Sequence, residues 1–115
     1  MANFKAIYRF AQISAQKVRP FADLVRGKYA DEAMEILSCY PNRGARLIED
    51  VIHSALSNAM TQSQIRRVDR VEIVDIRIDS AAIGRRWRPK ARGATSPYKK
   101  RSSHISVTVS DGATN

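Results

Sequence analysis

The chain has 115 residues, of which 43% are hydrophobic, and this length suits one domain with a modest core. It carries 20 Lys and Arg against 11 Asp and Glu, a formal net charge of +9 at pH 7. No apolar run approaches the roughly 20 residues of a membrane span, and the start MANFKAIYRF lacks the apolar block of a signal peptide. We therefore expect a cytoplasmic protein with no membrane partner.

A strand and then a helix are predicted at the start of the chain. In FKAIYRF, residues 4–10, apolar residues recur at every second position, which favours a strand with one imperfectly polar face. The alternating residues are Phe4, Ala6, Tyr8 and Phe10. A helix is expected between Ser14, a possible N-cap, and Gly27, which suits its C-terminal stop. Its apolar face comprises Val18, Phe21, Ala22 and Val25. Because Pro20 is tolerated only in a first turn, we expect the regular helix to begin near Val18 or to kink there.

A short second helix is predicted over YADEAMEILSCY, residues 29–40. Asp31 and Glu32 lie where the positive end of a helix dipole favours negative charge, and Pro41 ends the segment. Its apolar residues are Met34, Ile36 and Leu37. Cys39 has no second cysteine as a disulfide partner, so we expect it to be packed as a small hydrophobic residue.

A long third helix and two strands complete the predicted domain. Asn42 is the expected N-cap of the helix, whose apolar stripe recurs at three- and four-residue spacing. The stripe comprises Ala45, Ile48, Val51, Ile52, Ala55, Leu56, Ala59 and Met60. In VEIVDIRID (residues 71–79) and HISVTVS (residues 104–110), apolar and polar residues alternate, which predicts two half-buried strands of one sheet. The inward residues are Val74, Ile76 and Ile78 in the first strand and Ile105, Val107 and Val109 in the second.

These two strands are joined by a basic segment, IGRRWRPKARGATSPYKKRSSH, residues 83–104. Residues 80–110 contain eight Lys or Arg and no acidic residue, while the rest of the chain has 12 basic against 11 acidic residues. Eight of the nine excess charges therefore lie in one segment, where they repel each other unless a polyanionic partner binds. A connection of about 20 residues is long for a hairpin, whose loops usually have two to five. As two extended arms it would reach about 30 Å beyond the sheet.

The residue types of this segment favour nucleic acid as the partner. The planar guanidinium group of Arg binds phosphate oxygens bidentately and stacks on bases, and arginines outnumber lysines here. Trp87 and Tyr98 could stack on unpaired bases, and cross-strand packing between the arms is an equal alternative. Pro89 and Gly93 indicate a turn around residues 90–93. The Gly-Lys-Ser/Thr ending of a phosphate-cradling loop is missing.

Catalysis is not expected. His53 and His104 belong to no sequence motif for metal or nucleophile chemistry, and Arg77 lies between Asp75 and Asp79 and neutralises them. We therefore expect neither enzyme activity nor a metal or cofactor. The basic segment also lacks the long apolar face that insertion into a membrane surface needs.

Further cations lie in the predicted globular part. Lys17, Arg19, Arg26 and Lys28 surround the first helix, and Arg66, Arg67 and Arg70 precede the second strand. Residues of this kind either contact RNA or form a solvated helix face, and the sequence leaves both interpretations open.

The stretches SAQKVRPFADLVRGKYADEAMEIL, SALSNAM and RPKARGATSPYKKRSSHISVTVSD are spread over nearly the whole chain. With RGK after the first helix and the ending KR-x-SHI-x-V-x-V, the chain resembles the bacterial family of large-subunit ribosomal protein number twenty-two. The resemblance implies an α+β fold in which a three-stranded antiparallel sheet packs with three helices, plus a long extended basic β-hairpin. A single globular domain is expected over residues 1–115, with residues 81–102 as a protruding RNA-binding hairpin and residues 112–115 as a flexible tail.

The same resemblance implies a structural constituent of the large ribosomal subunit, which binds large-subunit rRNA, stabilises its assembly and lines the nascent-peptide exit tunnel with its hairpin tip. Its partners would be that RNA, neighbouring ribosomal proteins near the tunnel and the nascent polypeptide, with no homo-oligomer. The implied rRNA-binding residues are Lys17, Arg19, Arg26, Lys28, Arg85, Arg86, Trp87, Arg88, Lys90, Arg92, Tyr98, Lys99, Lys100, Arg101 and His104. The implied tunnel-tip residues are Arg88, Pro89, Lys90, Ala91, Arg92, Gly93, Ala94 and Thr95.

The alternative to this interpretation is a free-standing RNA- or DNA-binding protein of regulatory type. Readers of double-stranded DNA usually place a helix or ribbon in a wide groove and often act as symmetric dimers. A long irregular basic arm suits the junctions of folded RNA better.

Overall fold

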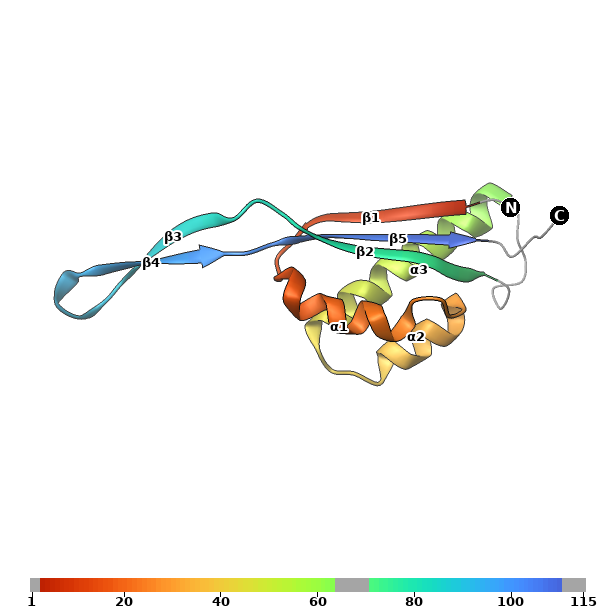
Figure 1. Ribbon diagram of the computed structural model, residues 1–115, viewed down its shortest axis with the longest axis horizontal. Coiled ribbons are helices and arrows are strands. Elements are labelled where there is room, and N and C mark those ends of the chain that lie inside the picture. The colour runs from red at the N-terminus through yellow and green to blue at the C-terminus, as the bar shows by residue number, and fades with distance from the viewer. Residues whose placement is uncertain (1–2, 64–70, 111–115) are drawn as a thin grey trace.

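The computed structural model describes residues 3–63 and 71–110, and Figure 1 shows the order of the elements. Arg66, Arg67, Arg70 and the expected tail at residues 112–115 lie outside the described residues. The elements of the first half are β1 (Asn3–Ala11), α1 (Ala15–Val25), α2 (Ala30–Ser38) and α3 (Arg43–Ser63). Those of the second half are β2 (Glu72–Ser80), β3 (Gly84–Pro89), the 3₁₀ turn η2 (Ala91–Gly93), β4 (Thr95–Lys100) and β5 (Ser103–Ser110).

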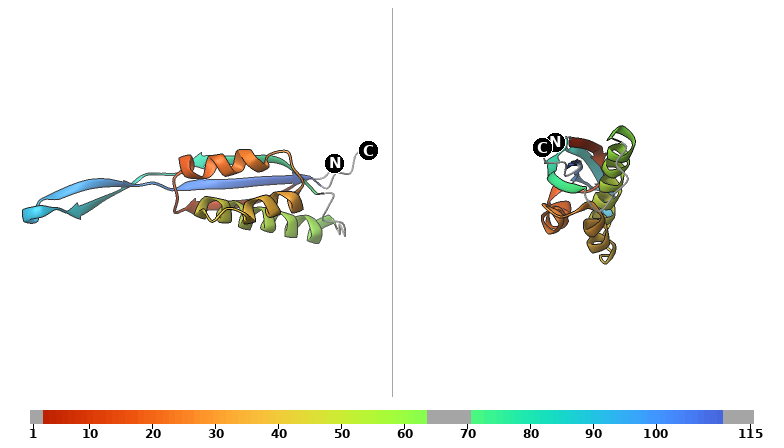
Figure 2. Two further views of the ribbon diagram at one scale, coloured as in Figure 1. Left: turned by 90° about the horizontal axis from the view of Figure 1, so that it is seen from below. Right: turned by 90° about the vertical axis from the view of Figure 1, so that its right-hand side faces the viewer.

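Three strands form an antiparallel sheet in the order β1-β5-β2, and the helices cover one of its faces. Helix α3 packs against β1 and β5, α1 packs against β2, and α2 packs against α3 (Figure 2). The predicted α+β fold of three helices and a three-stranded antiparallel sheet is confirmed. Strands β3 and β4 pair with each other in a separate two-stranded antiparallel sheet.

The core lies between the sheet and the helices, and most of it follows the predicted apolar faces. Ile105, Val107 and Val109 of β5 are fully buried, as expected for the central strand of the sheet. The α3 stripe is buried from Ala45 to Ala59. Met60 was predicted to belong to this stripe, and that prediction is wrong, because Met60 is 42% exposed and Ala59 takes the inward position in the last turns of the helix.

Irregular pairing in β2 moves one predicted core residue to the surface. The register of β2 against β5 shifts between Ile73 and Asp75, so the alternation changes phase within the strand. Ile73 is therefore buried and Val74 is 44% exposed, which makes the predicted inward position of Val74 wrong. Beyond the shift, Ile76 and Ile78 are buried as predicted.

A similar irregularity ends the alternation of β1. Phe4 and Ala6 are buried, but the register against β5 shifts between Tyr8 and Ala11. Phe10 adopts a φ of 57°, in the left-handed region that residues with a side chain seldom occupy. Tyr8 and Phe10 are both exposed, and Ala11 takes the buried position that follows the shift.

Helix α1 begins at Ala15 and contains Pro20 in its interior, so the expected start near Val18 is wrong. A helical Pro20 leaves the carbonyl of Gln16 without its usual amide donor, and Gln16 is exposed in the first turn, where water can hydrogen-bond to that carbonyl. The helix ends at the predicted place, because Gly27 has a φ of +84° immediately after the C-cap.

Cys39 is exposed, which makes its expected packing in the core wrong. It is the C-cap residue of α2, where the helix ends, and its thiol donates to the carbonyl of Glu35 at 3.5 Å. Leu37 takes the buried position of this last turn instead.

The molecule is elongated because β3 and β4 extend away from the three-stranded sheet (Figure 1). Its principal extents are 67 × 25 × 19 Å and its radius of gyration is 17.3 Å. A compact domain of this length would have a radius of gyration of about 13 Å. No helix within residues 3–63 and 71–110 is long and apolar enough to cross a membrane.

Candidate nucleic-acid interface

The two strands β3 and β4, with the turn between them, form a ribbon over residues 84–100 that presents cations on both of its faces. Residues directly opposite each other in an antiparallel pair share a face, and neighbours along a strand alternate. The pairing of Arg86 with Tyr98 and of Gly84 with Lys100 therefore defines one face, and the pairing of Arg85 with Lys99 and of Trp87 with Pro97 defines the other. The first face carries Arg86, Arg88, Tyr98 and Lys100, and the second carries Arg85, Trp87 and Lys99.

The two aromatic residues of the ribbon are used differently. The guanidinium carbon of Arg88 lies 4.3 Å from the ring centroid of Tyr98, a cation–π contact between strands. Tyr98 is half-buried beneath this contact, which supports the packing alternative for that ring. Trp87 is 66% exposed on the opposite face, so most of its indole surface is accessible for stacking.

The tip of the ribbon is a tight turn. The amide of Lys90 donates to the carbonyl of Ala94, and Arg92 and Gly93 have φ values of 60° and 75°. The sequence indicated a bend at Gly93, but the left-handed conformation of Arg92 was not expected, since a residue with a side chain is disfavoured there by roughly 1–2 kcal/mol. Residues 88–95 are all exposed, including the three that carry charge, Arg88, Lys90 and Arg92.

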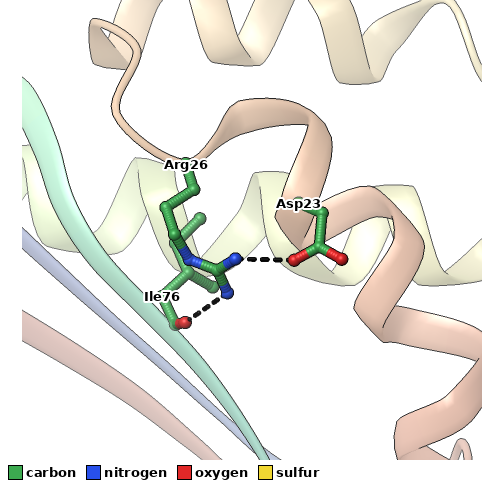
Figure 3. Close-up of polar contacts among 3 residues, drawn as sticks. All are labelled: Asp23, Arg26 and Ile76. Atoms are coloured by element: carbon green, nitrogen blue, oxygen red, sulfur yellow. Dashed lines mark hydrogen bonds and ion pairs between the residues drawn. The ribbon is translucent and has the colours of Figure 1, made fainter.

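Arg19 of α1 and Arg26, the C-cap residue of that helix, are bound to the edge of the sheet. Arg26 donates from Nη2 to the carbonyl of Ile76 at 2.9 Å and from Nη1 to Oδ1 of Asp23 at 2.6 Å (Figure 3). Arg19 donates from Nη2 to the carbonyl of Ile78 at 3.1 Å. Both carbonyls belong to β2, which is an edge strand of the sheet. These two side chains therefore attach α1 to β2 by satisfying acceptors that the sheet leaves open.

The residues after α1 cover the beginning of the same edge. The amide of Gly27 donates to the carbonyl of Ile73, and the amide of Ile73 donates to the carbonyl of Lys28. The amide of Ala30 donates to the carbonyl of Val71. The RGK motif thus has a structural use in this protein, because it closes an edge that could otherwise pair with another chain.

A groove of about 1340 Å³ lies where the ribbon joins the helical layer. It brings together several predicted RNA-binding residues that are far apart in the sequence, namely Lys17, Arg19, Arg88, Tyr98, Lys99, Lys100 and Arg101. The other predicted residues lie outside it, namely Arg26, Lys28, Arg85, Arg86, Trp87, Lys90, Arg92 and His104.

The groove also contains Arg43, which sequence analysis missed. Arg43 is the first residue of α3, and this helix has no acidic residue in its first turn. A cation at the positive end of a helix dipole is unfavourable for the helix. A basic residue directly after the expected N-cap, where it does not help the helix, is the feature of the sequence that could have identified Arg43 as a functional residue.

Gly44 allows this part of the groove to form. A Cβ atom at Gly44 would lie 3.0 Å from the carbonyl oxygen of Lys17 and 3.3 Å from Cδ2 of Phe21. The first turn of α3 therefore approaches the backbone of α1 closely, and this approach brings Arg43 to the same groove as Lys17.

His104 lies apart from the groove, on the sheet. It lines a second, smaller hollow of about 270 Å³, together with the basic side chains of Lys5, Arg9 and Arg77. Arg77 forms an ion pair with Asp75 of the same strand, with 2.9 Å between Nε and Oδ2, so the expected neutralisation is present for Asp75. Among residues 3–63 and 71–110, no three His, Cys, Asp or Glu residues are grouped so that they could hold a metal ion.

Comparison with known proteins places these features in a family. Residues 6–110 match the model of the family described as ribosomal protein L22p/L17e. The chain is 48% identical over 111 residues to the large ribosomal subunit protein uL22 of Rhodopirellula baltica, and the match covers 93% of each chain. It is 45% identical over 108 residues to the protein of the same name from Herpetosiphon aurantiacus, covering 94% of this chain and 95% of that one. The uL22 of Finegoldia magna is 40% identical over 107 residues, with coverage of 93% and 95%. The chain belongs to the ribosomal protein L22p/L17e family.

Proposed function

We propose that this protein is a structural constituent of the large ribosomal subunit in the cytoplasm, where it binds large-subunit rRNA. Its relatives are named large ribosomal subunit proteins, and as a member of a ribosomal protein family it has a structural rather than a catalytic role. The proposal includes neighbouring ribosomal proteins as partners and a contribution to subunit assembly.

The observation that carries the proposal is the charge on both faces of the ribbon. A ribbon that lies on a protein surface or a flat anionic surface needs cations on one face only. Here each face carries at least two cations and one aromatic ring, and η2 continues the basic character to the tip with Arg92. Such a ribbon suits insertion between RNA segments, where phosphates meet it from both sides and exposed Trp87 can stack on a base.

The same geometry supports a role for the tip in the exit tunnel. If rRNA surrounds the arms, residues 88–95 emerge at the far end of the ribbon as a compact exposed turn. Lys90 and Arg92 then set the charge and the size of the side chains that a passing polypeptide meets. We propose residues 81–102 as the RNA-binding hairpin, residues 88–95 as the tunnel tip, and the nascent polypeptide as a further partner.

Sucrose-gradient sedimentation tests the proposal against the alternative of a free-standing regulatory protein. A tagged copy is expressed in bacterial cells depleted of their own family member, and the lysate is sedimented at low and high salt. Co-migration with the large subunit is expected, and replacement of residues 85–100 by a short Gly-Ser turn should abolish it. A peak of free protein or of a soluble dimer, with an empty large-subunit fraction, would favour the regulatory alternative.

A further inference from the structure

The groove at the root of the ribbon has two opposed walls of like charge. One wall consists of the N-terminal part of α1 and the first turn of α3, with Lys17, Arg19 and Arg43. The other consists of the ribbon and the residue after it, with Arg88, Lys99 and Lys100 followed by Arg101. None of the residues that the structure places around this groove is Asp or Glu. Seven cations thus face one space with no internal counter-charge.

This arrangement is unfavourable in the free protein. Cations on both walls repel each other across the groove, and Arg43 adds a positive charge to the positive end of α3. Arg19 donates a hydrogen bond to the carbonyl of Ile78, but a neutral carbonyl does not cancel the positive charge of the guanidinium group. A fold that maintains such a concentration of cations is favoured when a polyanion occupies the groove.

The size of the groove indicates what kind of anion fits. Small-molecule pockets usually have volumes of about 300–1,000 Å³ and are mostly apolar. This groove has about 1340 Å³, and its lining, which comes from five separate stretches of the chain, includes seven cationic side chains beside apolar ones. A polymer whose charges recur along its length matches cations that are distributed along two walls.

We propose that one continuous segment of RNA sugar-phosphate backbone lies in this groove and is contacted by both walls at once, with Arg43 as an additional RNA-binding residue. The inference rests on the proposed rRNA-binding function and extends it from the ribbon to the helical layer. Because the bound segment bridges the two walls, it also holds the direction of the ribbon relative to the helices.

A double-mutant cycle across the groove tests this proposal. The affinity of the full chain for a large-subunit rRNA transcript is measured by filter binding for Arg43→Ala, Lys100→Ala and the double variant. Two matched controls lie outside the groove: Arg46→Ala, one turn further along α3, and Arg85→Ala, on the other face of the ribbon from Lys100. Thermal melting of each free variant reports on folding.

Arg43→Ala should lower RNA affinity several-fold and reduce the slope of log K against log[salt] by roughly one unit. Its free form should melt at the same temperature as the wild type or higher, since a repulsive charge is removed, whereas a merely structural arginine would lower it. Arg46→Ala should leave affinity unchanged. The double variant Arg43→Ala with Lys100→Ala should lose about threefold less affinity than the product of the single losses, because both residues hold one segment. For the double variant Arg43→Ala with Arg85→Ala, the fold-loss of RNA affinity should equal the product of the two single losses.

The possible failures are distinguishable. If the wild type does not bind the transcript more tightly than a small-subunit rRNA transcript, the proposed function fails and the groove proposal fails with it. If the wild type binds but Arg43→Ala behaves like Arg46→Ala, only the groove proposal is overturned. If the losses from Arg43→Ala and Lys100→Ala multiply fully, the walls contact separate RNA segments, and the proposed continuous segment is wrong.

Discussion

The backbone amide of Phe10 donates a hydrogen bond to Nδ1 of His104 at 3.0 Å, joining residues that are 94 positions apart in the chain. The two rings also meet edge to face, with centroids 4.7 Å apart and an interplanar angle of 84°. Because Nδ1 accepts, the proton of the neutral imidazole is on Nε2. The contacts of His104 therefore support the left-handed conformation of Phe10 at the irregularity in β1, and they leave only Nε2 free to donate to a partner.

Replacing His104 by Ala should lower the free energy of unfolding by about 1–2 kcal/mol, since both the hydrogen bond and the ring contact are lost. Chemical denaturation of the free protein measures this effect. The matched control is His53→Ala, at an exposed position of α3, which should change stability by less than about 0.5 kcal/mol. Equal effects of the two substitutions would contradict a structural role for His104.

Replacing Arg26 by Ala should destabilise the domain by about 1 kcal/mol, because the carbonyl of Ile76 loses its donor at the edge of the sheet. Asp23→Ala removes only an exposed ion pair and should cost less than about 0.5 kcal/mol. Denaturation and RNA binding are measured on the same variants. An Arg26→Ala variant with wild-type stability but strongly reduced RNA affinity would show that its phosphate contact matters more than its contact with β2.

Replacing Gly44 by Val should cost roughly 1–3 kcal/mol, because a branched side chain does not fit against the backbone of Lys17 and the ring of Phe21. The control Arg46→Val places the same side chain at an exposed position of α3 and should cost only the difference in helix propensity, at most about 0.7 kcal/mol. Thermal melting distinguishes the two. Similar melting temperatures for both variants would mean that α1 and α3 separate without penalty.

Replacing Lys99, Lys100 and Arg101 together by Ala should flatten the slope of log K against log[salt] for rRNA by roughly two to three units. Each residue is exposed at the C-terminal end of the ribbon and is expected to neutralise one phosphate. Filter binding over a range of KCl concentrations gives the slope. A variant whose affinity falls while its slope stays at the wild-type value would refute the phosphate assignment.

Deleting Arg85, Arg86 and Trp87 should shift the tip without unfolding the domain, because these exposed residues of β3 pair only with β4 in the described structure. Reconstituted ribosomes carrying the deletion should be less sensitive to macrolide-type drugs, and stalling peptides should stall less. Melting of the free variant is the control. Unchanged translation with unchanged melting would place the tip elsewhere, and a large loss of stability would show that the ribbon belongs to the folding unit.

The alternation and spacing of apolar residues were sufficient to predict most of the architecture. Period-two alternation identified the buried face of β5 at Ile105, Val107 and Val109, and the three- and four-residue spacing identified the buried side of α3. These predictions succeed because the geometry of a strand or helix sets which side chains share a face, whatever the rest of the chain does. The concentration of cations in residues 80–110 likewise indicated a polyanionic partner without reference to any contact.

Other features depend on how distant elements meet, and no local pattern contains that information. The register shift that exposes Val74 and buries Ile73 arises from the pairing of β2 with β5. In the sequence Arg26 resembles any other basic residue near the first helix, and only packing places it against the carbonyl of Ile76. Arg43 and Lys99 are 56 positions apart (99 − 43), and they share one groove only because Gly44 lets α3 approach α1 where the ribbon leaves the sheet. The periodicity of apolar residues shows which side chains share a face of one helix or strand. The distances between helices and strands depend instead on how side chains pack and which hydrogen bonds they form, and these contacts exist only in the folded chain.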